Sequence, residues 1–264
     1  GMLIPWGFLT ESVSAWNIAV IHTCFNVAAT CVLMPMNGLL VKLAYLVIPS
    51  QETPQEEALL DERLLATPAV AIQRAHEIAG QMAIDAAEGM KIAIELTKKF
   101  SESAMEQVVE IEDKTDRYED ALGTYLVKLS NENLTVHDNR ILNTLLYTIS
   151  DIERVADYSV SVAKVALEMK EKEIQFSSQA KGELVVLEQA VLDIVDRTVA
   201  AYEAFDLKEA IKVESQEQVV SALVREVKSR HIRRLRDGLC SVEYGFVLED
   251  LLTACERTAA HCSN

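Results

Sequence analysis

The sequence predicts an all-α protein, a tandem of two three-helix bundles preceded by a hydrophobic transmembrane helix. Three observations lead to this fold class. The 264-residue chain holds only 9 Gly and 5 Pro, and no proline follows Pro68; this is too few for the many turns of a β-sandwich. After that proline, apolar residues recur at helical spacing. The long periodic segments are separated by short polar turns, as in an up-down bundle.

Residues 1–49 form the predicted hydrophobic segment. No formally charged residue occurs from Ser12 to Val41, a length that exceeds the roughly 20 residues needed to cross a hydrocarbon core. The best spanning candidate is AWNIAVIHTCFNVAATCVLM, after which Pro35 breaks the run. A buried core helix and a signal peptide are the alternatives, and the signal peptide is disfavoured because no basic region precedes the apolar run.

Residues 50–67 are polar, acidic and contain Pro54, which predicts a linker. Two domains of three helices each are expected after it, the first over 68–174 and the second over 175–264. The predicted helices are 68–99, 101–129, 136–172, 178–204, 207–236 and 242–262.

An internal repeat supports these two domains. Glu112 precedes Glu214 by 102 residues, and Glu153 precedes Glu256 by 103. Two separate pairs at nearly the same offset indicate a duplicated three-helix unit of about 100 residues.

Four acidic residues occupy one register beside the predicted core of the first repeat. Glu112 and Asp116 each follow an apolar seam position on one helix, and Glu153 and Asp157 do so on the next. We call these four residues the acidic quartet. Residues four apart share a helix face, so the quartet could converge between neighbouring helices. A hard cation with oxygen ligands would relieve the repulsion; a solvated acidic surface is the alternative.

Two groups of basic residues are expected to form ion pairs. Arg154 and Arg257 follow equivalent glutamates in the two repeats, which predicts ion pairs between helices. The run over 225–236 holds six Lys or Arg residues in twelve. We expect a solvated helix face that pairs with neighbouring glutamates, and a surface for anionic lipid or an acidic partner is the alternative.

The net charge and the missing motifs exclude several functional classes. The chain has 41 acidic and 25 basic residues, a net charge of −16, which disfavours a free-standing nucleic-acid-binding protein. It lacks Glu-x-x-His, Gly-rich phosphate-loop, Gly-x-Ser-x-Gly and His-Glu-x-x-His motifs. The five cysteines form no CxxC pair, which favours a reducing compartment. A non-enzymatic protein is therefore expected, with a metal-dependent helical enzyme as the weaker alternative.

Three segments resemble the PhoU-like domain, which is a tandem of two three-helix bundles: EIEDKTDRYED, ISDIERVADYS and DGLCSVEYGFVLEDLLTACERTAAHCSN. The resemblance covers roughly residues 66–264. The stretch IAVIHTCFNVAATCVLMPMNGLLVKLAYLVIP is similar to the last membrane segment of bacterial sodium-dependent phosphate cotransporters, in which a PhoU-like domain follows the membrane part. With a single candidate span, this chain is not expected to transport phosphate by itself.

The resemblance implies a regulatory domain associated with sodium-dependent phosphate transport, or a wholly soluble PhoU-like regulator of phosphate signalling. It also implies that the acidic quartet binds a divalent or trivalent metal ion such as iron, zinc or magnesium. Gln218 and Ala260 replace the aspartates in the second repeat, so a second cluster is not expected. The expected partners are a phosphate transporter membrane domain or the membrane itself, a signalling protein and a second copy of the chain. The implied location is the inner membrane, with the helical domain on the cytoplasmic side.

Overall fold

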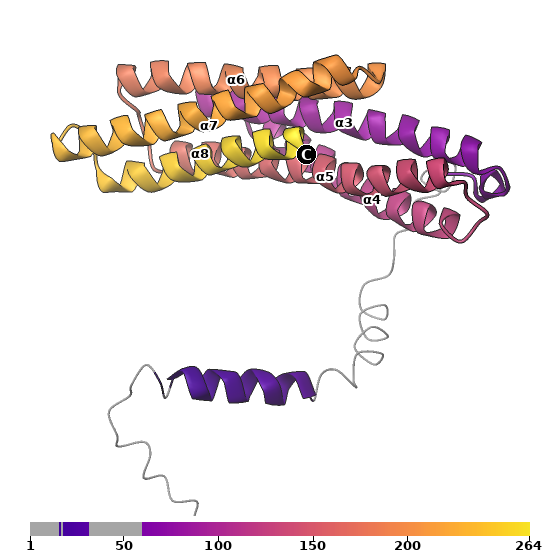
Figure 1. Ribbon diagram of the computed structural model, residues 1–264. Coiled ribbons are helices and arrows are strands. Elements are labelled where there is room, and N and C mark those ends of the chain that lie inside the picture. Colours follow the sequence, from indigo (N-terminus) through magenta and orange to yellow (C-terminus); the bar gives the residue numbers. More distant parts are fainter. Residues whose placement is uncertain (1–15, 17, 32–59) are drawn as a thin grey trace, which may run out of the picture. The chain divides into compact units, whose positions relative to one another are not determined.

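The computed structural model describes residue 16 and residues 18–31 and 60–264 (Figure 1). The chain divides into two compact units, Gly1–Thr53 and Pro54–Asn264. In the first unit, residue 16 and residues 18–31 are helical, and the rest of the predicted span lies outside the described residues. No helix in the described ranges is both long and apolar enough to cross a membrane.

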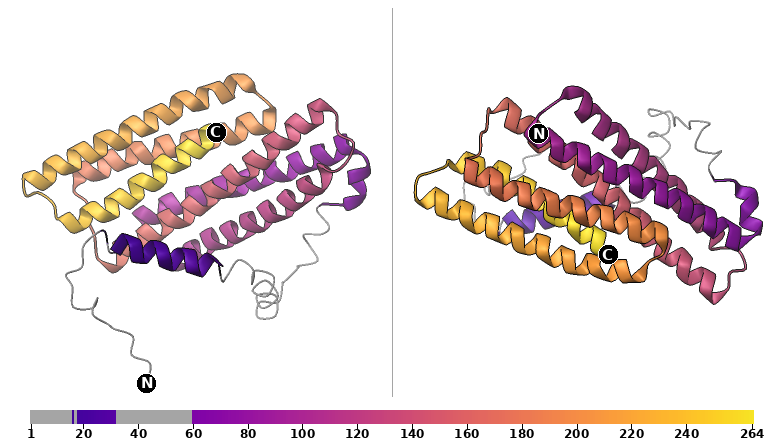
Figure 2. Two further views of the ribbon diagram at one scale, coloured as in Figure 1. Left: turned by 60° about the horizontal axis from the view of Figure 1, so that its bottom comes forward. Right: turned by 90° about the horizontal axis from the view of Figure 1, so that it is seen from above.

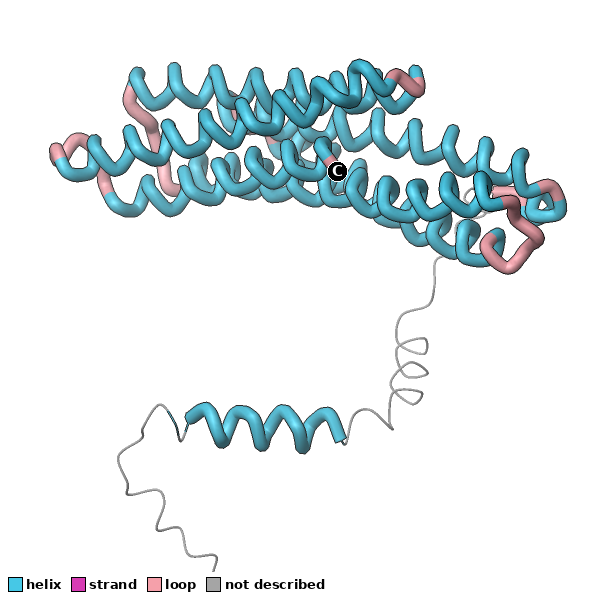
Figure 3. The backbone as a smooth tube through the Cα atoms, viewed as in Figure 1, coloured by secondary structure: helices cyan, strands magenta, loops and turns pink. Residues whose placement is uncertain are grey.

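The described part of the second unit is built entirely from helices (Figure 3). Its elements are η2 Glu62–Ala66, α3 Pro68–Lys98, α4 Glu102–Leu129, α5 Val136–Glu171, α6 Ser178–Ala204, α7 Leu207–Arg236 and α8 Val242–Ser263. The all-α class is confirmed, and each predicted helix is found with both ends shifted by no more than one residue. The end of the predicted linker is helical in the structure. It forms the short 3-10 helix η2, and the side chain of Asp61 caps the first turn of that helix.

Local chemistry explains where these helices begin. Pro68 lies in the first turn of α3, where its missing N–H would have no partner within the helix. At the start of α5, Thr135 and Asp138 form a reciprocal capping box. Side-chain oxygens also cap the first turns of α6, α7 and α8, from Ser177, Asp206 and Ser241.

The six long helices of residues 60–264 pack as two triplets (Figure 2). Helices α3, α4 and α5 contact one another, as do α6, α7 and α8. Contacts of α3 with α6 and of α5 with α8 join the triplets, and both triplets belong to the unit Pro54–Asn264. That the triplets arose by duplication, with a boundary at residues 174 and 175, remains a prediction.

The main hydrophobic core of residues 60–264 has two large parts, and α3 and α5 contribute to both. The first part includes Met82 of α3, Leu126 of α4 and Leu142 of α5. The second fills the space among α6, α7 and α8 and includes residues from the C-terminal halves of α3 and α5, such as Met90 and Val162. The long helices α3 and α5 therefore form a wall that the two triplets share.

The predicted apolar seams of α4 and α5 face this core. Thr115 and Ser159 are buried at seam positions, and their hydroxyls donate to the carbonyls of Ile111 and Ala156 at 2.7 and 2.6 Å. These bonds satisfy polar groups that would otherwise be costly to bury. The seam register therefore places the acidic quartet at the edge of the core, as predicted.

Candidate functional site

The acidic quartet lies where α4 and α5 pack side by side. Burial raises the pKa of Glu112 on α4, and repulsion from Asp157 of α5 and from Asp116 adds to the rise. Burial also raises the pKa of Glu153 on α5, and Asp157 and Asp116 add to that rise although Arg154 opposes it. The four carboxylates therefore form one electrostatic group across the two helices.

Glu119 belongs to the same group, although it is not among the site residues predicted from the sequence. Burial raises the pKa of Glu119, and repulsion from Asp120 and Asp116 adds to the rise. Glu119 follows the seam residue Tyr118 just as Glu112 follows Ile111. Applying the rule of one residue after the seam along the whole of α4 would have found it.

Arg154 is bound to half of the quartet. Its Nε lies 3.1 Å from a carboxylate oxygen of Glu153, and its Nη1 lies 2.8 Å from one of Asp157. All three residues are on α5, so the ion pair between helices predicted for Arg154 is wrong; neighbours one and three residues away on its own helix are within easier reach. No three His, Cys, Asp or Glu side chains of the described residues come together closely enough to ligate one metal ion, and the metal site remains a prediction.

The basic run of α7 pairs with glutamates, as expected from the sequence. Nη1 of Arg234 lies 2.9 Å from both carboxylate oxygens of Glu183 on α6, and both side chains are buried. Lys228 pairs with Glu249 of α8 at 2.6 Å. Part of the run therefore ties α7 to the other two helices of its triplet.

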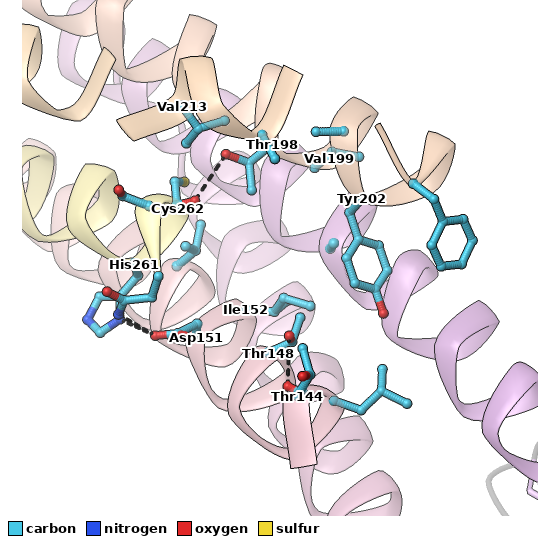
Figure 4. A pocket seen from close by; sticks show the side chains of 18 of the residues that line it. Thr144, Thr148, Asp151, Ile152, Thr198, Val199, Tyr202, Val213, His261 and Cys262 are labelled. Carbon is cyan, nitrogen blue, oxygen red and sulfur yellow. Dashed lines mark hydrogen bonds and ion pairs between the residues drawn. The ribbon is translucent and has the colours of Figure 1, made fainter. Parts of the chain in front are cut away.

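A cleft of about 720 Å³ lies at the junction of the triplets (Figure 4). Residues of α3, α5, α6, α7 and the end of α8 line it, and most of them are apolar. Ile152 of α5 and Val199 of α6 lie in its wall, close to Tyr202. No pattern in the sequence predicts this cleft.

The end of α8 closes part of the cleft by contacts with α5 and α6 (Figure 4). His261 Nδ1 lies 2.8 Å from Asp151 Oδ1, and Asn264 donates to the same oxygen at 2.9 Å. Thr198 of α6 donates to the carbonyl of Cys262 at 3.4 Å. Burial raises the pKa of the Cys262 thiol to about 12, so this thiol stays protonated and unreactive at neutral pH.

An aromatic stack forms another part of the wall. The ring of His76 on α3 lies between the rings of Tyr202 and Phe205, with centroid distances of 4.3 and 4.2 Å. Phe205 ends α6 with a φ of 52°, in the left-handed region. A phenylalanine is uncommon there, and the stack gives this residue a packing partner.

Residues 74–166 match the family model described as the PhoU domain. This segment of the chain is similar to the PhoU domain. The matched segment runs from α3 to near the end of α5, and it includes the whole acidic quartet and Glu119. The PhoU resemblance expected from the sequence is thus confirmed for the first triplet.

Two curated proteins are similar in sequence to this chain. The chain is 23% identical over 178 residues to the phosphate-specific transport system accessory protein PhoU homolog 1 of Thermotoga maritima, a match that covers 67% of this chain and 76% of that protein. It is 30% identical over 118 residues to the phosphate-specific transport system accessory protein PhoU of Edwardsiella tarda, covering 43% of this chain and 46% of that protein.

Solved structures of PhoU proteins have the same fold. The phosphate transport system regulatory protein PhoU from Streptococcus pneumoniae superposes with a TM-score of 0.67 at 16% identity, covering 75% of this chain and 92% of that chain. PhoU from Pseudomonas aeruginosa gives a TM-score of 0.61 at 18% identity, with coverage of 76% and 93%. These matches extend the fold assignment beyond the PhoU domain segment.

The comparisons confirm the expected non-enzymatic class and leave one expectation without support. The relatives from Thermotoga maritima, Edwardsiella tarda and Streptococcus pneumoniae are named as accessory or regulatory proteins. None of the four proteins, nor the family model, is described as a sodium-dependent phosphate cotransporter. The similarity therefore supports the PhoU part of the expected resemblance and not its association with a cotransporter.

Proposed function

We propose that this PhoU-domain protein regulates phosphate uptake by acting on a phosphate transporter. The observation that carries the proposal is the match of residues 74–166 to the PhoU domain. The accessory proteins of Thermotoga maritima and Edwardsiella tarda, which serve a phosphate-specific transport system by name, supply the partner class. All five cysteines are free, which fits action on the cytoplasmic side, where thiols stay reduced.

Deletion of the gene in its own host tests this function. Uptake of radiolabelled phosphate is measured at low and high external phosphate, with sulfate uptake as the control. We expect the mutant to lose the difference in phosphate uptake between the two conditions, to recover it with the wild-type gene, and to keep normal sulfate uptake. Phosphate uptake that responds normally without the gene would contradict the proposal.

Cation binding by the acidic quartet is the proposed regulatory input. The mutual repulsion of the carboxylates supports it, because a cation would relieve that repulsion. The ion pairs of Arg154 argue against cation binding, because this residue already binds the carboxylates of Glu153 and Asp157.

The test is a titration of iron, zinc and magnesium into the wild type and the Asp116→Asn, Asp157→Asn and Arg154→Gln variants. We expect the two aspartate variants to bind more weakly and Arg154→Gln more tightly; equal affinity in all four proteins would exclude the site.

Membrane attachment through the uncharged stretch from Ser12 to Val41 is a second candidate role. The absence of formal charge over a length sufficient to cross a bilayer favours the tethered regulator, whereas the accessory proteins favour a regulator without a cotransporter segment. Flotation with liposomes compares the full chain with a variant that begins at residue 51. Flotation of the full chain alone would favour the tethered form, and failure of both to float would exclude it.

A further inference from the structure

We propose that the cleft at the junction of the triplets binds a single-chain anionic amphiphile, a fatty acid or a lysophospholipid. The acyl chain would lie among the apolar side chains, and the anionic head group would pair with Arg140. This site is independent of the proposed role in phosphate transport and of the acidic quartet.

The size and lining of the cleft suit an acyl chain. Its volume of about 720 Å³ falls within the roughly 300–1,000 Å³ typical of small-molecule sites. Apolar residues of α5 and α6, including Ile152, Val155, Val195 and Val199, line its interior. Phe205 and Leu207 also line it, and they are 73% and 79% exposed. The apolar surface therefore continues from the interior to solvent, which gives a chain a path of entry.

The threonine and tyrosine hydroxyls of the wall have no free donor for a polar ligand. The threonine and tyrosine hydroxyls in the lining all donate to backbone carbonyls of their own or neighbouring helices. These four donors are Thr144, Thr148, Thr198 and Tyr202. A sugar or nucleotide depends on such groups for orientation, whereas an acyl chain needs none.

One basic side chain of the lining, Arg140, is available to pair with an anion. Arg140 is the only Lys or Arg in the lining, and no ion pair within the described residues engages it. The two lining carboxylates are already engaged. Asp151 accepts from Asn264 and contacts His261, and Asp206 accepts from the first backbone N–H groups of α7. An anionic head group could therefore pair with the guanidinium of Arg140, whereas Asp151 and Asp206, although hydrogen-bonded, keep their negative charge.

Calorimetric titration of the full chain with decanoate, dodecanoate, dodecanol and lauroyl lysophosphatidylglycerol, all below their micelle concentrations, tests the site. We expect saturable 1:1 binding of dodecanoate, up to about fifteenfold tighter than decanoate because each buried methylene contributes up to about fourfold. Dodecanol should bind about tenfold more weakly than dodecanoate, because it cannot form the charge-assisted bond. Tighter binding of the free acid or of the lysophospholipid supports the proposal and identifies the source of the chain.

Variants locate the binding. Val199→Trp and Thr148→Trp fill the cleft from opposite helices and should abolish binding, while circular dichroism melts check that each folds. Arg140→Gln should reduce dodecanoate affinity to that of dodecanol, and Arg236→Gln, at an exposed site on α7 outside the lining, should change nothing. If binding survives both tryptophan variants, the amphiphile binds elsewhere on the protein. If the wild type binds none of these amphiphiles, an apolar protein segment becomes the expected occupant of the cleft. Either result would overturn the proposal.

Discussion

The imidazole ring of His76 on α3 lies parallel to the phenol ring of Tyr202 on α6, with centroids 4.3 Å apart and 1° between the planes. Tyr202 Oη also donates to the carbonyl of His76 at 3.4 Å. Because α3 belongs to one triplet and α6 to the other, this pair joins the triplets beside the cleft. The contact combines a stacked aromatic surface with a titratable group, so its contribution to stability depends on pH.

Acidification should weaken the wild type relative to a His76→Phe variant, which keeps an aromatic ring but does not titrate. Burial lowers the pKa of His76, with Glu77 opposing the shift, so folding favours the neutral ring. The associated stability is present above about pH 6.5 and is lost as the pH falls toward the folded-state pKa. Urea unfolding of both proteins at pH 5.5 and 7.5 measures this effect. A difference in unfolding free energy that is the same at both pH values would contradict it.

Removing Glu183 should be costly. Glu183→Ala leaves the buried guanidinium of Arg234 without its carboxylate, which we expect to cost about 3–5 kcal/mol of unfolding free energy. Glu226→Ala, which breaks an ion pair with the exposed side chain of Arg230, should cost less than about 1 kcal/mol.

The double variant Glu183→Leu, Arg234→Met completes this test. Because a buried ion pair can be replaced by apolar side chains of similar size at little cost, it should recover most of the stability lost in Glu183→Ala. Chemical denaturation measures all the variants. If the double variant is as unstable as Glu183→Ala, the loss comes from packing around the side chains and not from the stranded charge.

Two glycines inside helices should respond differently to alanine. A Cβ on Gly182 of α6 would meet no atom within 4 Å, whereas one on Gly89 of α3 would lie 3.2 Å from Ile111 Cγ2 and from Ser159 Oγ. Gly182→Ala should therefore stabilise the protein by about 0.5–1 kcal/mol through helix propensity. Gly89→Ala should gain less or lose stability, because α4 and α5 approach α3 closely there. Thermal melts of the two variants compare them directly, and an equal gain at both sites would disprove the close approach.

Glu119→Gln should stabilise the protein at pH 7 by about 0.2–0.5 kcal/mol, because it removes repulsion from acidic neighbours on α4. The pKa of Glu119 is raised in the folded state, so its ionisation disfavours folding once the pH exceeds the ordinary value of 4.5. The gain should disappear as the pH falls through the folded pKa to below 4.5, where the carboxyl is protonated in both states. Glu110→Gln, at an exposed position of the same helix, is the control. A gain that persists at pH 4 would show that repulsion is not its cause.

Local sequence features predict most of the fold. The ends of α6 and α7 follow from Ser177, from Asp206 and from the polar turns between the helices, and these signals need no knowledge of the tertiary structure. The heptad pattern of α4 and α5 also places the acidic quartet correctly beside the core. The N-terminal apolar run is different, because hydrophobic composition alone does not distinguish a membrane helix from other apolar helices.

The partners of Arg154 and the cleft depend on distances between side chains in the folded protein, and the periodicity of the sequence does not specify these distances. Arg154 was expected to pair with a carboxylate on another helix. It pairs instead with Glu153 and Asp157, because these side chains lie within one turn of it on α5. The cleft brings His76, Asp151 and Tyr202 together from distant parts of the sequence. Its existence depends on how the triplets pack against each other, which no single-helix pattern specifies.

The length of α5 has a mechanical consequence. With 36 residues, it forms a rod of about 54 Å, one half of which packs in the first triplet while the other half packs against α8. A rod of that length that tilts by about 5° about one end displaces the other end by about 5 Å. Because Glu153 and Asp157 lie near the middle of α5, the same tilt about these carboxylates would displace each tip of the rod by about 2 Å.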